Sequence, residues 1–221
     1  MADLSKERDG TKRDGTTLYL VHHGSTPLDE SGRVHGWGQA SLSAKGRKDA
    51  AAAAEYLSSK GVGETYSSDL ARGIETAAII HKKLGIKKPN TEREGLRPMD
   101  VGTLAGEKDE DIEGIMSDLK SRLWAHAPGS SQSVAKFLAV WGKELDRSIQ
   151  EALNEDHACV YVTHSHNMAT LPYLLSTGVA PIRLRSPVGP GGVVALHISD
   201  RGGQVILDHQ FDPNPVEIDG Q

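Results

Sequence analysis

The sequence contains almost no cysteine and no long hydrophobic run, and each shortage excludes a class of protein. Cys159 is the only cysteine in 221 residues, so a disulfide framework within the chain is excluded and a reducing compartment is expected. No apolar stretch approaches the roughly 18 residues of a membrane-spanning helix, and the polar N-terminal segment lacks the hydrophobic centre of a signal peptide. We therefore expect a cytoplasmic protein with no membrane partner.

A strong excess of charge of one sign is also lacking. The chain carries 25 lysine and arginine residues against 30 aspartate and glutamate residues, and the two signs are well mixed. This pattern gives no polybasic face for nucleic acid or anionic lipid, so no nucleic-acid partner is expected. Any anion that the protein binds must be held by a local cluster of donors.

The length and the apolar content predict one globular domain. Hydrophobic residues make up 37% of the chain, an ordinary share for a soluble protein, and 221 residues are enough to bury a core without disulfides. Residues 1–15 are charged and poor in large apolar side chains, so we expect a disordered tail there. The predicted domain spans residues 16–212, and residues 213–221 are expected to form a C-terminal tail.

Two short apolar runs end in histidine. Residues 18–21 favour a buried strand and lead into His22 and His23, and residues 160–163 lead into His164. Open α/β sheets bind ligands at the carboxyl ends of their strands. If both runs belong to one parallel sheet, His23 and His164 come face to face; the alternative is that they are two unrelated surface histidines.

Helical and strand patterns alternate along most of the chain. Further strands are predicted at 62–67, 193–198 and 205–207, the last two forming a hairpin. Helices are predicted at 43–59, from Ser68 or Asp69 to Lys83, in part of 107–124, at 133–153, and at 167–176 with a kink at Pro172. This order predicts an α/β fold, a three-layer α-β-α sandwich around a mostly parallel mixed sheet with an antiparallel edge.

Four short motifs occur in a fixed order along the chain. They are VHHGSTPLD from residue 21, GWGQASLSAKG from residue 36, YSSDLARGIETA from residue 66 and VTHS from residue 162. Together they resemble the histidine phosphatase superfamily, which includes the cofactor-dependent phosphoglycerate mutases, over residues 18–196. The resemblance implies a phosphoglycerate-mutase-like fold, a phosphorylated small molecule or phosphoprotein as substrate, and neither a metal ion nor another cofactor.

The resemblance also implies roles for individual side chains. His23 would be the nucleophile, because a neutral imidazole can accept a phosphoryl group and split hydrolysis into two displacements. Arg72 and His164 would donate hydrogen bonds to the phosphoryl oxygens as charge develops on them. Gly36 and Ser165 lie in the same motifs and are candidates for phosphate or substrate binding.

The chain departs from the family pattern at three candidate phosphate-binding positions, two of them in the first motif. His22 stands where the family has arginine, so we expect it to need a proton for full activity, which predicts an acidic pH optimum. Asp29 replaces an asparagine, and a carboxylate beside phosphate requires a cation such as His22, Arg33 or His35 unless it points away. His35 itself occupies a position where mutases carry a threonine near the substrate.

The group that protonates the leaving group is also displaced. Pro98 stands where phosphatase branches have a glutamate, and Ser165 stands where another branch has an aspartate. Asp100, two residues beyond Pro98, would share its face in an extended segment and is the predicted substitute. Alternatively, the substrates have leaving groups that need little help, such as phosphohistidine or acyl phosphates.

These observations leave two functions open. The first is a phosphatase that hydrolyses phosphomonoesters or activated phosphoryl groups through a phosphohistidine on His23. The second is a catalytically degraded relative that binds a phosphorylated ligand or partner without turnover. The resemblance disfavours a mutase, because residues 106–128 form a short segment that lacks the paired arginines and lysine with which the mutases hold phosphoglycerate. A metal site is not expected, because no carboxylate lies at metal-ligand spacing in the histidine-rich mouth. The sequence makes no prediction of oligomeric state.

Overall fold

The computed structural model of the chain describes residues 15–122, 124–130, 132–176, 188–198 and 205–213. Apart from Gly15 and Pro213, the predicted tails lie outside these residues, and so does the turn at 199–204. Within the described part of the chain, no helix combines the length and the apolar content needed to cross a lipid bilayer.

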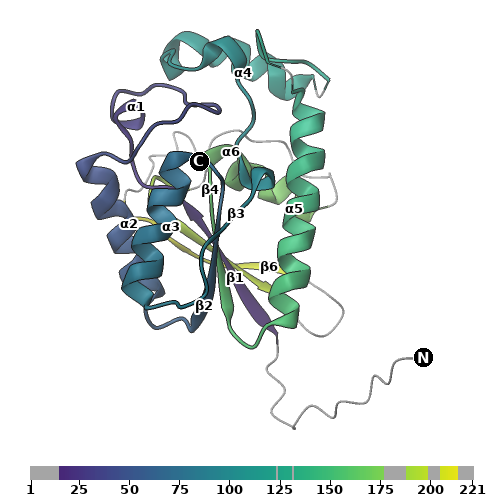
Figure 1. Ribbon diagram of the computed structural model, residues 1–221. Helices are drawn as coiled ribbons and strands as arrows, with labels where there is room; N and C mark the ends of the chain where they lie inside the picture. Colours follow the sequence, from purple (N-terminus) through teal and green to yellow (C-terminus); the bar gives the residue numbers. More distant parts are fainter. Residues whose placement is uncertain (1–14, 123, 131, 177–187, 199–204, 214–221) are drawn as a thin grey trace.

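The strands form one mixed sheet in the order β3-β2-β4-β1-β5-β6 (Figure 1). Their bounds are β1 Thr16–His22, β2 Val62–Ser67, β3 Thr91–Glu92, β4 Ala158–Thr163, β5 Val193–Ile198 and β6 Val205–Phe211. The first four strands of this order are parallel, β5 is antiparallel to β1, and β6 is antiparallel to β5. The predicted mostly parallel sheet with an antiparallel edge is therefore confirmed.

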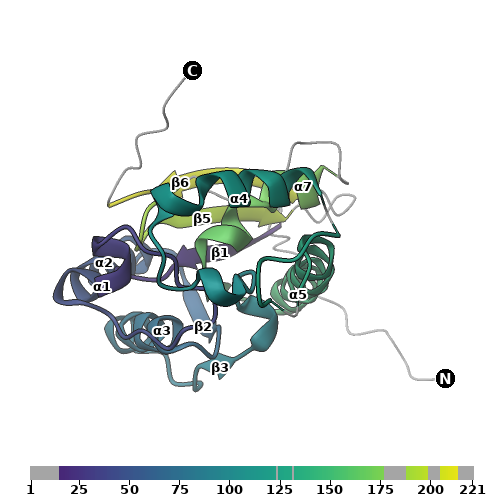
Figure 2. The same ribbon diagram turned by 90° about the horizontal axis from the view of Figure 1, so that it is seen from above.

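Helices cover both faces of the sheet, with α2 and α3 on one side and α5 on the other (Figures 1 and 2). The helices are α1 Pro27–Glu30, α2 Ala44–Leu57, α3 Ala71–Leu84, α4 Asp109–Ser121, α5 Val134–Asn154, α6 Ser165–Ala169 and α7 Leu171–Leu175. Short 3-10 turns, η1 Glu94–Leu96 and η2 Gly102–Leu104, follow β3. Figure 1 shows α1 and α4 together at one end of the molecule, beyond the sheet.

β1 is buried on both faces because it lies between β4 and β5 under both helical layers. Successive side chains of a strand point to opposite faces, so Leu18 and Leu20 enter the core under α5, and Tyr19 and Val21 enter the core under α2 and α3. A strand with two buried faces needs a continuous apolar run rather than an alternating one. This explains the run that ends at the first histidine pair.

The ends of two helices differ from the sequence prediction at positions that the site uses. Ser43 caps α2 as expected, its hydroxyl accepting from the backbone N–H of Gly46. The predicted cap of α3 at Ser68 or Asp69 is wrong, because α3 begins after Leu70 without a side-chain cap. The hydroxyl of Ser68 is bonded to His164 instead, and the carboxylate of Asp69 is bonded to Arg97.

The helix predicted at 167–176 is two short helices, α6 and α7, rather than one kinked helix. The chain breaks at Thr170, whose hydroxyl donates to the carbonyl oxygens of His166 and Asn167. Pro172 lies in the first turn of α7, where its missing N–H costs no helical hydrogen bond. The start of α6 at Ser165 places this helix directly after the histidine at the end of β4.

Candidate active site

The carboxyl ends of β1 and β4 lie side by side, and each leads directly into a histidine. His22 is in register with Thr163, and the backbone N–H of His23 donates to the carbonyl oxygen of Thr163. His23 and His164 are both buried, and their ring centroids are 4.9 Å apart. The two histidine-ended strands therefore bring these imidazoles together, as the sequence pattern predicts.

The hydrogen bonds of His23 fix its protonation. Its Nδ1 lies 2.9 Å from the carbonyl oxygen of Gly24, which can only accept, so Nδ1 carries the hydrogen. Nε2 is then a lone pair, and it accepts from Nε of Arg72 at 3.2 Å. Burial, together with the charges of His22 and Arg72, holds the pKa of His23 well below its ordinary value of 6.5. At neutral pH this imidazole is uncharged and presents a nucleophilic Nε2.

Arg72 is hydrogen-bonded both to His23 and to the loop after α1. Its Nη1 donates to the carbonyl oxygen of Gly38 at 2.7 Å, and its Nη2 donates to that of Gly36 at 2.9 Å. Burial lowers the pKa of Arg72 to about 10, so the guanidinium keeps its charge at neutral pH. Gly36 thus contributes a carbonyl oxygen that orients Arg72, and its backbone φ of 51° suits glycine.

His164 is oriented by a hydrogen bond to Ser68. Its Nε2 lies 2.8 Å from the hydroxyl of Ser68, and its buried Nδ1 has no hydrogen-bond partner among the described residues. Burial and the charge of Arg72 lower the pKa of His164 well below its usual value. A second uncharged imidazole therefore faces the first across the site.

His22 is oriented by a backbone carbonyl rather than turned freely toward the site. Its Nδ1 donates to the carbonyl oxygen of Val188 at 3.2 Å, and its ring meets the ring of His23 edge-on at 4.7 Å. Burial lowers the pKa of His22, although the charge of Asp29 opposes this shift. The residue that replaces the family arginine is consequently uncharged at neutral pH and gains its charge only in acid.

Asp29 is paired with His35, one of the three cations that the sequence allows. One carboxylate oxygen accepts from the backbone N–H of Thr26 at 2.8 Å, and the other lies 3.1 Å from Nε2 of His35. Burial raises the pKa of Asp29, but the hydrogen bond from His35 and the charge of His23 outweigh it, so the pKa lies far below its ordinary range. The ring centroids of His35 and His23 are 5.8 Å apart, so the ion pair of Asp29 and His35 lies beside His23.

The other two predicted site residues have different surroundings. The carboxylate of Asp100 accepts from the backbone N–H of Gly102 at 3.0 Å and from the hydroxyl of Ser130, in the segment before α5, at 2.9 Å, so both of its oxygens are bonded. Ser165 begins α6 immediately after His164 and is half-buried. The proposed proton-donating role of Asp100 and the binding role of Ser165 stay predictions.

The segment after His23 is held against α2 by a buried carboxylate that the sequence does not reveal. The carboxylate of Asp49 on α2 accepts from both the backbone N–H and the hydroxyl of Ser25, at 3.1 and 2.5 Å. The ammonium group of Lys45 lies 3.0 Å from the same hydroxyl. A Cβ atom on Gly46 would lie 1.8 Å from the carbonyl oxygen of Ser25, so the two backbones are in direct contact. The motif that contains Gly46 signals this contact, whereas nothing near Asp49 marks it as a buried acid.

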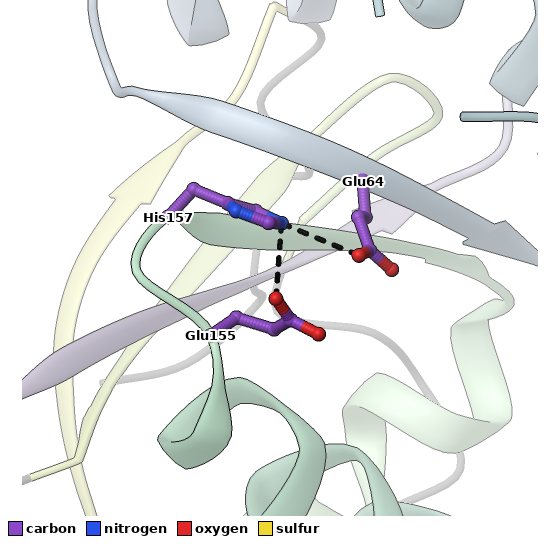
Figure 3. A group of neighbouring side chains, drawn as sticks. All are labelled: Glu64, Glu155 and His157. Carbon is purple, nitrogen blue, oxygen red and sulfur yellow. Dashed lines mark ion pairs between the residues drawn. The ribbon is translucent and has the colours of Figure 1, made fainter. Parts of the chain in front are cut away.

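One group of metal-type side chains lies away from this site, at the amino ends of β2 and β4. Figure 3 shows the imidazole of His157 between the carboxylates of Glu64 and Glu155, at 3.5 and 3.9 Å. The ammonium group of Lys88 is already paired with Glu64, and the hydroxyl of Tyr66 donates to the same carboxylate. These contacts compensate the buried charge of Glu64, so the group is an ion-pair cluster at the edge of the core.

Facing imidazoles and a buried guanidinium at the carboxyl ends of a parallel sheet are typical of a site that handles phosphoryl groups. The family model of the histidine phosphatase superfamily (branch 1) matches residues 18–209 of this chain. The protein therefore belongs to the histidine phosphatase superfamily, and the predicted membership is confirmed.

Similar proteins include both mutases and phosphatases. The chain is 27% identical over 176 residues to a probable phosphoglycerate mutase GpmB of Yersinia enterocolitica, covering 76% of this chain and 80% of the relative. It resembles the solved mycobacterial glucosyl-3-phosphoglycerate phosphatase with a TM-score of 0.73 at 23% identity, covering 87% of this chain and 97% of that structure. A mutant phosphoserine phosphatase of Entamoeba histolytica in complex with phosphoserine gives a TM-score of 0.73 at 23% identity, over 88% and 96% of the two chains. The fold is thus that of the phosphoglycerate-mutase-like enzymes, and the general chemistry of the family is phosphoryl transfer.

Proposed function

We propose that the protein is a phosphatase that hydrolyses phosphomonoesters or activated phosphoryl groups through a phosphohistidine on His23. The observation that carries this proposal is the state of the His23 ring. Its Nδ1–H is committed to the carbonyl oxygen of Gly24, and its uncharged Nε2 lies 3.2 Å from Arg72. A neutral, oriented imidazole beside a fixed cation has what a phosphoryl-accepting nucleophile requires.

In this reaction Nε2 of His23 attacks phosphorus while the bond to the leaving group breaks. The Nε–H of Arg72 leaves Nε2 of His23 as that lone pair bonds to phosphorus, while two other N–H groups stay on the carbonyl oxygens of Gly38 and Gly36. Three of the five N–H groups of Arg72 are then available for phosphoryl oxygens. His164 supplies a further ring nitrogen on the far side of His23. Water then attacks the phosphohistidine, the P–N bond breaks with its electron pair returning to Nε2, and inorganic phosphate leaves.

A small phosphorylated molecule is the proposed substrate. The names of the similar proteins refer to phosphoglycerate, glucosyl-3-phosphoglycerate and phosphoserine, each of which is a phosphate ester of a small polar molecule. The mixed surface charge of this chain agrees with a substrate held locally rather than by a broad basic face. Hydrolysis is favoured over mutase activity because residues 106–128 lack the paired arginines and lysine expected of a phosphoglycerate mutase.

The proposal is tested by incubating the protein with phosphoramidate, an activated phosphoryl donor, and measuring its intact mass across about pH 5 to 8. We expect one acid-labile phosphoryl adduct that is lost in His23→Asn. The matched control is His81→Gln near the end of α3, whose ring is bonded to the carbonyl oxygen of Lys88 outside the site and which should keep the adduct. Absence of the adduct at every pH, with binding of inorganic phosphate retained, would favour the alternative of a relative that binds without turnover.

A further inference from the structure

We propose that His35, held by Asp29, gives the proton to the leaving group and takes one from the attacking water, in the reaction proposed above on which this assignment rests. Both positions at which the family places a carboxylic acid are occupied here by residues without one, Pro98 and Ser165. The carboxylate of Asp100 already accepts from Gly102 and from Ser130 in the segment before α5. A leaving group that needs a proton therefore calls for a different donor beside His23.

The hydrogen bonds of the pair set which nitrogen of His35 is available. Asp29 is ionised because its pKa lies far below neutral, so its carboxylate only accepts. Nε2 of His35, 3.1 Å away, therefore carries a hydrogen that points to Asp29, and the hydroxyl of Thr26 also lies 3.1 Å from it. Nδ1 is the other ring nitrogen, and it is buried with no hydrogen-bond partner among the described residues. A proton on Nδ1 thus has no acceptor among the described residues, and we assign this nitrogen the transfer to the substrate.

The carboxylate also stabilises the charged ring that the acid role requires. The second carboxylate oxygen of Asp29 accepts from the backbone N–H of Thr26, 2.8 Å away, and this bond fixes the carboxylate at the start of α1. His35 is fixed in turn by its neighbour Gly36, whose carbonyl oxygen accepts from Arg72. The imidazole of His35 is only 11% exposed, and its ring centroid lies 5.8 Å from that of His23.

The proton transfers balance over the two steps. In the first step His23 attacks phosphorus, the P–O bond to the leaving group breaks, and the departing oxygen takes the Nδ1 proton of His35, which becomes a neutral imidazole. In the second step water attacks the phosphohistidine and gives a proton to the same Nδ1. The P–N bond breaks, phosphate leaves, and His35 is an imidazolium again. Asp29 does not react and is a positioning residue.

Several titratable groups surround His35 and must be considered in any pH profile. They are Asp29 on α1, His22 and His23 at the end of β1, Arg72 on α3, and His164 and His166 beside the start of α6. Burial holds the pKa of each of these four histidines below its ordinary value, and Arg72 stays charged at neutral pH. These groups affect the rates on two similar substrates alike, so the ratio of the two rates within each variant removes their contribution.

The test compares p-nitrophenyl phosphate with p-nitrobenzyl phosphate. The two esters share a ring and differ in the leaving group, since the aryl oxide leaves without a proton whereas the benzyl alkoxide needs one. First-turnover rates are measured by rapid mixing for wild type, His35→Gln, Asp29→Asn and the control His81→Gln. Asparagine at position 29 keeps an oxygen that can accept from the N–H of Thr26, so the start of α1 is retained.

We expect His35→Gln to lose activity on the benzyl ester by about 100-fold more than on the aryl ester, the lower end of the range for general acid catalysis. Asp29→Asn should show the same selective loss on the benzyl ester, because the imidazole of His35 has lost the carboxylate that lies 3.1 Å from its Nε2. Phosphohistidine should accumulate in His35→Gln because the water has lost its base.

Equal loss of both esters in His35→Gln would show that His35 has only a structural role and would overturn the proposal. That result leaves the phosphatase assignment intact, because wild type still forms the adduct on His23. Absence of the adduct in wild type would instead reject both the phosphatase and the acid assignment. The far-ultraviolet circular dichroism of each variant checks that it is folded.

Discussion

Replacement of Gly46 by alanine tests how closely α2 supports the nucleophile. A Cβ atom at this position would lie 1.8 Å from the carbonyl oxygen of Ser25, where about 3.4 Å is needed for ordinary contact. The two backbones must therefore separate by roughly 1.5 Å, and Ser25 is only two residues from His23. A displacement of about 1 Å in a catalytic group can reduce the rate about 100-fold, so kcat/KM should fall by at least that much.

Stability should fall as well, although alanine is the better helix former. Overpacking of this kind costs about 1–3 kcal/mol, which exceeds the gain of up to about 1 kcal/mol from replacing glycine inside a helix. The matched control is Gly114→Ala in α4, where a Cβ atom would meet nothing within 4 Å. There the helix preference acts alone, and stability should rise by about 0.5–1 kcal/mol.

Urea unfolding followed by circular dichroism measures both variants against wild type, and phosphate-ester turnover measures activity. The expected result is opposite signs of the change in unfolding free energy, with activity lost only in Gly46→Ala. If Gly46→Ala were as stable and as active as wild type, the contact between α2 and the loop after β1 would not position His23, and the argument would be wrong.

Three further outcomes follow from charge and geometry. Burial and the charge of Arg72 lower the pKa of His166 from 6.5 to about 4, so the unfolded chain binds a proton that the folded chain does not. This group alone should lower the unfolding free energy by about 3 kcal/mol between pH 7 and pH 4, and His166→Gln should remove that share from the urea-derived profile. Arg72→Lys should lower kcat/KM by about 100-fold or more, because an ammonium group cannot reach His23, Gly36 and Gly38 together. Because the pKa of His22 is lowered, kcat/KM should rise as pH falls below about 6.5, and His22→Gln should remove the rise; a flat wild-type profile would contradict the need for a charged His22.

The sequence predicts the elements that rest on local periodicity. Residues 62–67 and 193–198 are strands with the predicted bounds, because each contains β-favouring residues, begins after a turn-forming glycine and is followed by serine and aspartate. The approach of His23 to His164 is also predictable, since two parallel strands that end in histidine can only meet at one edge of a sheet.

The remaining features depend on tertiary partners that a single segment does not reveal. Ser68 has the composition of a helix cap, but its hydroxyl is bonded to His164, ninety-six residues away. Asp49 looks like an exposed helical acid, yet it is buried against Ser25. The sequence allows several nearby cations as partners of Asp29. The turn around α1 brings His35 to it.

The central position of β1 has a consequence for how the protein loses activity. Hydrogen bonds to β4 and β5 on its two edges and packed side chains on both faces make this strand the last to open, so its amides should exchange with solvent only through global unfolding. His23, the proposed nucleophile, follows this strand directly, whereas His35, the proposed proton donor, comes after the four-residue helix α1 at one end of the molecule. Damage to the periphery can therefore abolish turnover while melting temperature and backbone protection along the strand stay as they were.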